Sequence, residues 1–522
     1  MHTAHQPARR RLPYGGSLVR PAFGILCMAI SLTTSLPSLI PSAHAGSGPA
    51  PQAIVAPVER NGFRQLTSYD SLQAFLADIS RGHPVRIDVL AKSRGGRSVS
   101  IAVLNPLEPP SGKQKLKILM FAQQHGDEAS GKEAMTIFLA RWASGDYAAI
   151  LQNVDLCIVP QMNPDGSELQ QRRTRDGIDL NRSHVLLNSP EVAALHEFFL
   201  RWQPEVTLDV HEYGAYSRSW SDSGFIKRGD VQLGMLSNLN SSARLRAYQR
   251  ESVYPSIASA MSQAGYAFHE YIVGTPRDRV RHSTTEINDG RQSFGILNTL
   301  SFIQEGWKGR TPEENLERRA KSQLLSIEAL LRHCDSHAAE IRELVQAERR
   351  ECERMAGKPF ALRMEHVHST GALRIPVRLV PSGADTTWEV TPYHDVVRAT
   401  AETTVPSAYV VPAGLRSVID FLTMHQVSME PVPAERTVEV EARRIDSVGF
   451  DVLEEDSLPR PFTTTERSVL TIQPGDFIVP TSQWHGLFLP TVLEPASMWG
   501  LTKYESYSWL LKKGRYPIFR IR

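Results

Sequence analysis

Short apolar segments alternate with helical patterns between residues 61 and 335, and this alternation constrains the fold more than any other feature of the chain. It is typical of α/β proteins, in which helices cover the faces of a sheet. We therefore predict an α/β fold for this region. The predicted strands are 117–122, 154–160, 205–210 and 297–303, and the predicted helices are 131–142 and 190–202, with Ser189 as the N-cap of the second.

The pattern changes beyond the α/β region. Residues 313–355 form a charged stretch with apolar side chains at helical spacing, and Val, Thr and Pro become frequent from about residue 360. Residues 437–442 alternate apolar and charged side chains, which is typical of a half-buried strand. The predicted organisation is a signal peptide at 1–45, a leader at 46–60, an α/β domain at 61–335, a helical connector at 336–359 and a β-rich accessory domain at 360–522.

The first 45 residues resemble a secretory signal peptide. Arginines at 9–11 and 20 precede an apolar stretch at 23–32, and Ala43-His44-Ala45 fits an A-x-A cleavage site. The alternative is an uncleaved membrane anchor, but the apolar stretch is short for a membrane span and Thr, Ser and Pro interrupt it. We expect cleavage after Ala45 and a mature protein in the periplasm or outside the cell.

Charge and cysteine content exclude several other classes of protein. Removing the four signal arginines from 58 basic residues leaves 54 against 56 acidic residues, so neither nucleic acid nor an anionic membrane is the expected partner. No later segment has the length and hydropathy of a membrane span, so we expect no stable membrane insertion. Cys157, Cys334 and Cys352 are too few for a metal cluster. A disulfide between Cys334 and Cys352, or buried free thiols, are both open alternatives.

Metal-binding side chains follow two of the predicted strands. The strand at 117–122 leads into His125 and Glu128, and the strand at 205–210 leads into His211. Two imidazoles and one carboxylate with a short and a long spacer are typical of a catalytic zinc site with an open coordination position. Asp209 shares a strand face with His211, so it either holds that ring or is a solvated carboxylate at the end of the strand.

A further carboxylate follows the last predicted strand. Glu305 lies directly after the apolar segment 297–303. Because ligands of open α/β sheets gather at the carboxyl ends of the strands, Glu305 is expected beside His125, Glu128 and His211. In that position it would accept a proton from a water molecule activated by the metal.

Two arginine-containing motifs lie between these strands. The turn 163–166, Asn-Pro-Asp-Gly, precedes the runs Arg-Arg-Thr-Arg at 172–175 and Asp-Leu-Asn-Arg at 179–182. A guanidinium group suits a free carboxylate and also polarises a carbonyl group. The alternative for an arginine-rich loop is a solvated, charged surface.

Taken in order, these motifs resemble those of the zinc metallocarboxypeptidases of the carboxypeptidase A/B type, or funnelins. The motifs are H-x-x-E, N-P-D-G, R-x-T-R, D-x-N-R, D-x-H and the glutamate after the last strand. The resemblance covers residues 61–310 and implies a mixed, about eight-stranded sheet flanked by helices. It implies a peptide substrate with a free C-terminal carboxylate. The implied roles are one zinc ion held by His125, Glu128 and His211, a general base at Glu305, an oxyanion-stabilising Arg172, and a carboxylate-binding pair, Asn181 and Arg182.

The sequence departs from the family pattern in two places. The segment 281–288 lacks the tyrosine that usually closes over the substrate there. His282 either replaces it or, as we predict, is a surface residue. Arg291 lies near the position that usually sets side-chain preference, where it binds an acidic group of the substrate or forms a structural salt bridge.

Two further functions are compatible with the same scaffold. One is an amidase or deacylase that acts on cell-wall peptides or N-acyl amino acids. The other is a non-catalytic peptide-binding protein, against which the complete set of ligands and Glu305 argue. The leading prediction is a zinc-dependent metallocarboxypeptidase.

Overall fold

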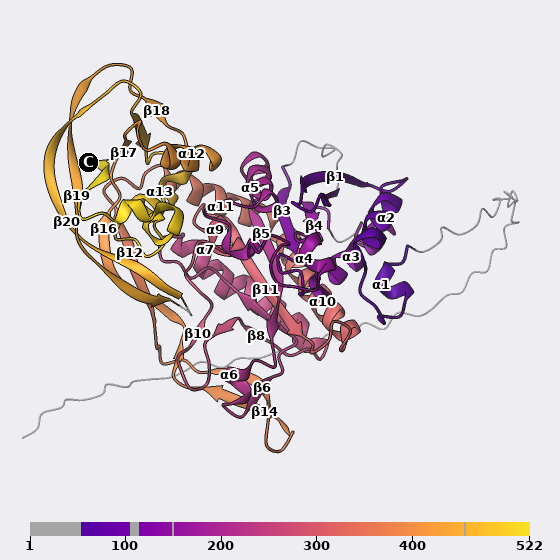
Figure 1. The fold of residues 1–522 in the computed structure, drawn as a ribbon. Coiled ribbons are helices and arrows are strands. Elements are labelled where there is room, and N and C mark those ends of the chain that lie inside the picture. The colour runs from indigo at the N-terminus through magenta and orange to yellow at the C-terminus, as the bar shows by residue number, and fades with distance from the viewer. Residues whose placement is uncertain (1–53, 105–113, 149–150, 454–455) are drawn as a thin grey trace, which may run out of the picture. The chain divides into compact units, whose positions relative to one another are not determined.

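The computed structural model describes residues 54–522 except 105–113, 149–150 and 454–455, so the predicted signal peptide lies outside the described residues. Its centre is an eight-stranded sheet with the order β1-β2-β4-β3-β5-β11-β7-β8 (Figure 1). The strands are β1 (Val85–Lys92), β2 (Ser98–Leu104), β3 (Leu116–Ala122), β4 (Val154–Val159), β5 (Val206–Gly214), β7 (Val231–Gly234), β8 (Phe268–Glu270) and β11 (Leu300–Lys308).

The sheet is mixed, as the family resemblance implies. Strands β4, β3, β5 and β11 run parallel to one another. β1 and β2 pair antiparallel at one edge, and β7 pairs antiparallel with β11 near the other. The parallel strands therefore bring their carboxyl ends to one edge of the sheet.

Strand β3 is buried on both faces, which explains its continuous apolar run. Ile118 and Met120 belong to a core shared with α3 (Ser130–Ala143) and α10 (Leu316–Ser336). Leu119 and Phe121 point to the opposite core, which includes side chains of α5 (Pro190–Trp202). The predicted helices and the Ser189 N-cap are confirmed, since Ser189 Oγ accepts a hydrogen bond from the Val192 amide at 3.4 Å.

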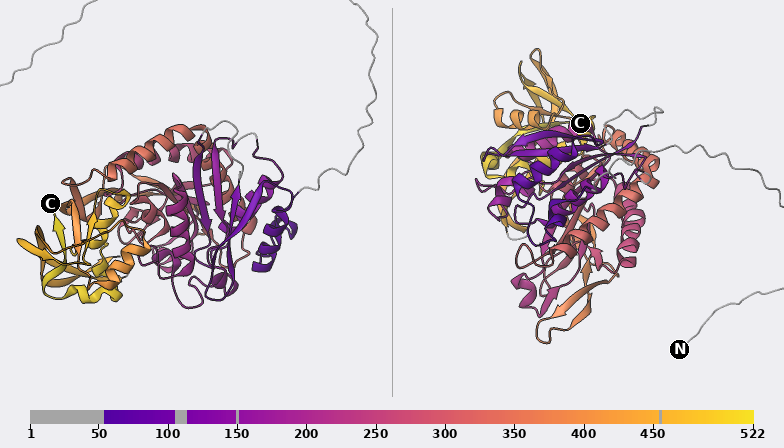
Figure 2. Two further views of the ribbon diagram at one scale, coloured as in Figure 1. Left: turned by 90° about the horizontal axis from the view of Figure 1, so that it is seen from above. Right: turned by 90° about the vertical axis from the view of Figure 1, so that its right-hand side faces the viewer.

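The charged stretch 313–355 contains two helices, α10 and α11 (Ala338–Cys352), which are the long salmon helices in Figure 2. His337 separates them with φ −116° and ψ 22°, outside the helical region. The remaining α-helices are α1 (Pro57–Arg60), α2 (Tyr69–Ile79), α4 (Pro164–Glu168), α6 (Arg218–Ser221), α7 (Ala243–Tyr248), α8 (Tyr254–Gln263), α9 (Gly290–Gly295), α12 (Arg416–Met424) and α13 (Phe488–Leu493).

Residues beyond 358 are rich in strands, as predicted. They form a six-stranded sheet with the order β18-β21-β17-β22-β19-β20, whose β19 and β20 make the long orange ribbon in Figure 1. The strands of this region, in that sheet and outside it, are β12 (Pro359–Val367), β13 (Leu373–Leu379), β14 (Asp385–Val390), β15 (Tyr393–His394), β16 (Val396–Thr404), β17 (Ala408–Val411), β18 (Glu430–Pro431), β19 (Arg436–Leu453), β20 (Asp456–Ile472), β21 (Phe477–Pro480) and β22 (Gly514–Ile521).

The C-terminal strands also pair with short strands of the α/β region. β13 pairs with β6 (Phe225–Lys227), and β15 pairs with β10 (Val280–His282). β10 pairs in turn with β9 (Ile272–Val273). The predicted boundary at residue 360 stays a prediction, and strand pairing crosses it twice.

Side chains from both regions share one hydrophobic core. Phe199 and Phe294 of the α/β region belong to the same buried cluster as Phe421 and Phe488. Trp484 joins the two by donating an indole hydrogen bond to the Leu297 carbonyl at 2.7 Å. This core lies on the Leu119 and Phe121 face of the sheet.

The structure bears on the predictions about a disulfide and about membrane insertion. Cys157, Cys334 and Cys352 are buried free thiols, so the disulfide alternative is not observed. Among the described residues, every helix is too short or too polar to cross a lipid bilayer.

Candidate metal centre and active site

A tight turn after β3 carries the first two predicted ligands. Gln123 adopts a positive φ of 56°, and the turn then presents His125 and Glu128 before α3 begins. Gly126 lies against the Asn-Pro-Asp-Gly turn, since a Cβ at this position would lie 2.1 Å from the Gly166 carbonyl carbon. The close packing of these two turns explains why both motifs contain a glycine.

The third predicted ligand and the predicted base come from adjacent strands. β5 and β11 stay paired as parallel strands as far as Gly214 and Lys308, which is beyond the strand ends that the sequence predicts. His211 and Glu305 therefore lie within the strands. These two residues are direct register partners. Partners in a parallel pair point to the same face of the sheet, so both side chains lie on one side.

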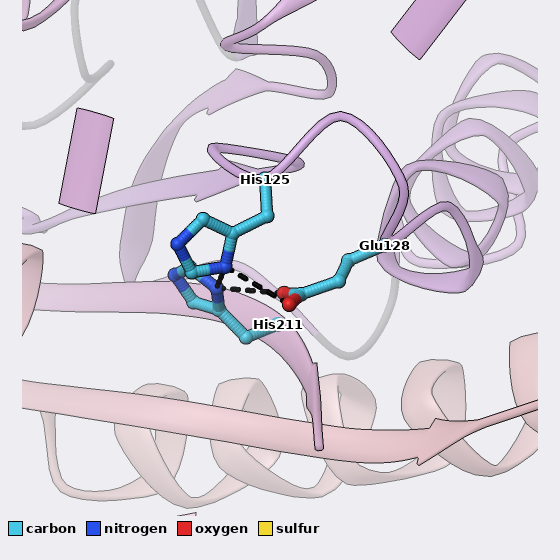
Figure 3. A group of neighbouring side chains, drawn as sticks. All are labelled: His125, Glu128 and His211. Carbon is cyan, nitrogen blue, oxygen red and sulfur yellow. Dashed lines mark hydrogen bonds and ion pairs between the residues drawn. The ribbon is translucent and has the colours of Figure 1, made fainter. Parts of the chain in front are cut away.

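The two imidazoles and the carboxylate converge on one point, as Figure 3 shows. His125 Nδ1 lies 2.9 Å from Glu128 Oε1, and His211 Nδ1 lies 2.9 Å from Glu128 Oε2. The two Nδ1 atoms are 3.1 Å apart. All three residues are buried. The structure therefore brings together the three residues that the sequence predicts as metal ligands.

The opposite edges of both imidazoles face carboxylates. His125 Nε2 lies 3.2 Å from Asp179 Oδ1, and His211 Nε2 lies 2.8 Å from Asp209 Oδ1. Such carboxylate–histidine pairs keep the proton on Nε2 and leave Nδ1 as a metal ligand. Asp209 is fully buried, so the alternative of a solvated carboxylate is wrong. The donor set and its surroundings fit zinc.

In the absence of a metal ion, the imidazoles and carboxylates of the centre shift one another's pKa values. Burial raises the pKa of Glu128, but the two adjacent imidazoles outweigh it and hold this pKa well below its usual value. Burial lowers the pKa of His211, but Asp209 and Glu128 outweigh it and raise this pKa well above its usual value. At the centre, the charges of the two imidazoles and of the nearby carboxylates therefore stabilise one another.

Glu305 has the environment of a general base. Its residue surface is 7% exposed, and burial raises its pKa to about 7, an effect that the nearby His211 opposes. A carboxylate with a pKa near neutrality accepts and returns a proton efficiently at neutral pH.

Arg172 reaches the centre from the loop after α4. Its Nε donates to Asp179 Oδ2 at 2.9 Å, and its Nη1 lies 3.2 Å from His125 Nδ1 and 3.8 Å from Glu128 Oε1. Its side chain is 44% exposed, so the guanidinium combines fixed contacts with access for a substrate. The alternative of a fully solvated surface loop does not describe this arginine.

Asn181 is buried beside the centre with its amide orientation defined. Its Oδ1 accepts hydrogen bonds from the Gly290 amide at 2.9 Å and from Gln124 Nε2 at 3.3 Å. The Nδ2 donors are therefore directed away from these two groups and suit a carboxylate. Arg182 follows directly, and its Nη1 donates to the Asn181 carbonyl at 2.9 Å.

Arg291 lies apart from this arrangement. It is fully buried, and its Nη2 pairs with Asp289 Oδ2 at 2.8 Å and donates to Thr284 Oγ1 at 3.0 Å. This favours the structural salt bridge over binding of an acidic group. The predicted surface position of His282 is wrong, because the ring is buried with Nδ1 3.1 Å from Glu270 Oε2.

Apart from Asp209, the sequence analysis did not identify the residues that hold this centre in place. Asp179 contacts both His125 and Arg172, and its position in the D-x-N-R motif was the available signal. Gln124 is a second such residue, since its Nε2 donates to Asp209 Oδ2 at 2.8 Å and its Oε1 lies 2.9 Å from His184 Nε2. The spacing of residues in the sequence does not indicate these contacts of Gln124 with Asp209 and His184.

Replacing Asp179 by Asn should weaken metal binding while leaving the fold intact. The amide cannot supply the negative charge that orients His125 and Arg172, and loss of such a partner lowers metal affinity about 10- to 100-fold. Competition with a zinc chelator measures the effect. Asp176→Asn is the matched control, because Asp176 lies in the same loop and pairs with Arg94 instead. Equal zinc affinity in the two variants would contradict the role assigned to Asp179.

The part of the chain that contains the candidate site is similar to known proteins. The zinc carboxypeptidase family, Peptidase_M14, matches residues 72–308. Carboxypeptidase 2 of Trichophyton rubrum is 23% identical over 459 residues, which cover 83% of this chain and 82% of the relative. Carboxypeptidase 2 of Trichophyton tonsurans is 24% identical over 455 residues, with 82% and 81% covered.

Among solved structures, a metallo-carboxypeptidase from Burkholderia cenocepacia is similar with a TM-score of 0.42 and 21% identity, over 53% of this chain and 71% of that one. The family match spans all three candidate ligands and Glu305. The resemblance predicted from the motifs is confirmed: residues 72–308 of this chain match the zinc carboxypeptidase family.

Proposed function

We propose that this zinc carboxypeptidase removes the last residue of peptides with a free C-terminal carboxylate, using one zinc ion held by His125, Glu128 and His211. The observation that carries the proposal is the approach of both Nδ1 atoms and the Glu128 carboxylate to within about 3 Å of one another, with Glu305 in register beside His211. When bound there, zinc would supply Lewis-acid activation of a water molecule and of the scissile carbonyl.

The substrate carboxylate would bind to Asn181 and Arg182. The fixed amide of Asn181 directs its Nδ2 donors outward, and the guanidinium of Arg182 supplies a matching positive charge. A peptide held there would present its last peptide bond to the metal centre. Arg172, oriented by Asp179, would donate to the carbonyl oxygen as negative charge develops on it.

Glu305 would move the proton. Its buried carboxylate takes a proton from the attacking water and returns it to the nitrogen of the leaving amino acid. Burial raises the pKa of Glu305 to about 7, which suits both steps near neutral pH. The signal-like segment 1–45 supports our proposal that the enzyme is exported to the periplasm or beyond.

A matched pair of peptides tests this function. We expect mass spectrometry to detect loss of one C-terminal residue from the free acid and no cleavage of the C-terminally amidated peptide, because only the free acid carries a carboxylate for Asn181 and Arg182. Addition of a zinc chelator should stop the reaction. Equal cleavage of the amidated peptide would favour the amidase or deacylase alternative.

A further inference from the structure

Lys227 places an ammonium group beside the active site from a segment that the family motifs do not include. It ends β6, where it pairs with Val377 of β13, and its residue surface is 9% exposed. Its Nζ lies 4.6 Å from the centre of the Tyr213 ring and 5.2 Å from that of Trp220. Two aromatic faces thus hold this cation.

This ammonium has no carboxylate within ion-pair distance among the residues that the structure describes, unlike other buried cations of the chain. Lys132 pairs with Glu133, Arg291 with Asp289, and Arg319 with Glu212. Burial lowers the pKa of Lys227 to about 8, and Glu305 is the charged group that opposes this effect. Lys227 therefore remains mostly protonated at neutral pH, and burial without an anionic partner is costly.

Strand register fixes the side of the active site on which Lys227 lies. Asp209, His211 and Tyr213 alternate along β5 and so share one face, in that order. Asn181 is joined to the Asp209 end through Gln124, whereas Lys227 lies over Tyr213 at the other end. His211 lies between the Asp209 end and the Tyr213 end of this face. A substrate held by its terminal carboxylate at Asn181 would therefore extend its preceding residue towards Lys227.

We propose that Lys227 binds the carboxylate of an acidic side chain on the penultimate residue of the substrate, so that the enzyme prefers Asp or Glu at this position. The inference rests on the function proposed above and adds a substrate class to it. The aromatic faces of Tyr213 and Trp220 hold the ammonium in place, and an incoming carboxylate would supply the anion that the described residues do not place within ion-pair distance.

The test uses two peptides that differ only in Glu or Gln at the penultimate position. We expect wild-type kcat/KM to be about 10- to 100-fold higher for the Glu peptide, the range for a hydrogen bond to a charged group. Lys227→Met should remove this preference and leave the Gln peptide within about threefold of wild type, since Met fills similar space. Lys308→Met is the matched control, because Lys308 is a neighbouring lysine that already pairs with Asp127.

Several outcomes would overturn the proposal. Equal loss on both peptides would mean that Lys227 acts through Glu305 and not on the substrate. A wild-type enzyme that does not distinguish the peptides would reject it even if Lys227→Met fails to fold. If the wild-type enzyme hydrolyses the Gln peptide well but slows on the Glu peptide, the proposed function holds and this inference fails. Hydrolysis of neither peptide would reject both.

Discussion

Replacing Glu305 by Gln is expected to reduce kcat by about 10²- to 10⁴-fold, the usual contribution of a general base. The amide has nearly the same shape as the carboxylate but cannot accept the proton of the attacking water. Because Glu305 lies beside His211 on the next strand and is not one of the three converging ligand groups, the zinc content should not change. Steady-state kinetics and metal analysis on the same sample measure both quantities.

Glu314→Gln is the control for this substitution. Glu314 contacts Tyr216 through its carboxylate and is not among the groups that converge on the metal centre. Its replacement should leave kcat within about twofold, as for surface substitutions in general. Wild-type activity in Glu305→Gln would mean that another group is the base, and loss of zinc in that variant would mean that Glu305 acts structurally.

Removal of residues 359–522 is expected to abolish folding of the α/β region. The core that contains Phe199 and Phe294 continues into Phe421 and Phe488, and β6 would lose its partner β13. Truncation would expose this core and leave the edge of β6 unpaired. A fragment of residues 46–358 should be aggregated or molten, as measured by solubility and by loss of a cooperative thermal transition.

Phe450→Ser in the full chain provides the control for truncation. Phe450 lies on β19 and is 70% exposed, so its replacement should not change the melting temperature measurably. A soluble, cooperatively melting and fully active fragment 46–358 would contradict this account and would support an independent accessory domain.

The central sheet and the metal ligands could be predicted because both depend on local patterns. Apolar runs identify strands buried on both faces, and the carboxyl ends of parallel strands meet at one edge. This reasoning brings His125, His211 and Glu305 together without knowledge of the loops. The strand ends were predicted too early, because the pairing of β5 with β11 continues through polar residues that apolar patterns do not mark.

Features that depend on distant segments could not be predicted. The partner of β6 lies about 150 residues further along the chain, in β13, and no local signal connects them. His282 has the character of a surface histidine in sequence, yet Glu270 and the surrounding strands bury it. Arg291 is a different case, because its carboxylate partner, Asp289, is only two residues away in sequence; its position in the family pattern suggested contact with the substrate instead.

A crystal of the purified protein measured at the zinc absorption edge tests the central claim most directly. The account predicts one anomalous peak about 2.0–2.2 Å from His125 Nδ1, His211 Nδ1 and the Glu128 carboxylate. It also predicts the Glu305 carboxylate beside that peak but outside ligand distance. An anomalous peak elsewhere, or none at this point in protein that retains activity, would contradict it.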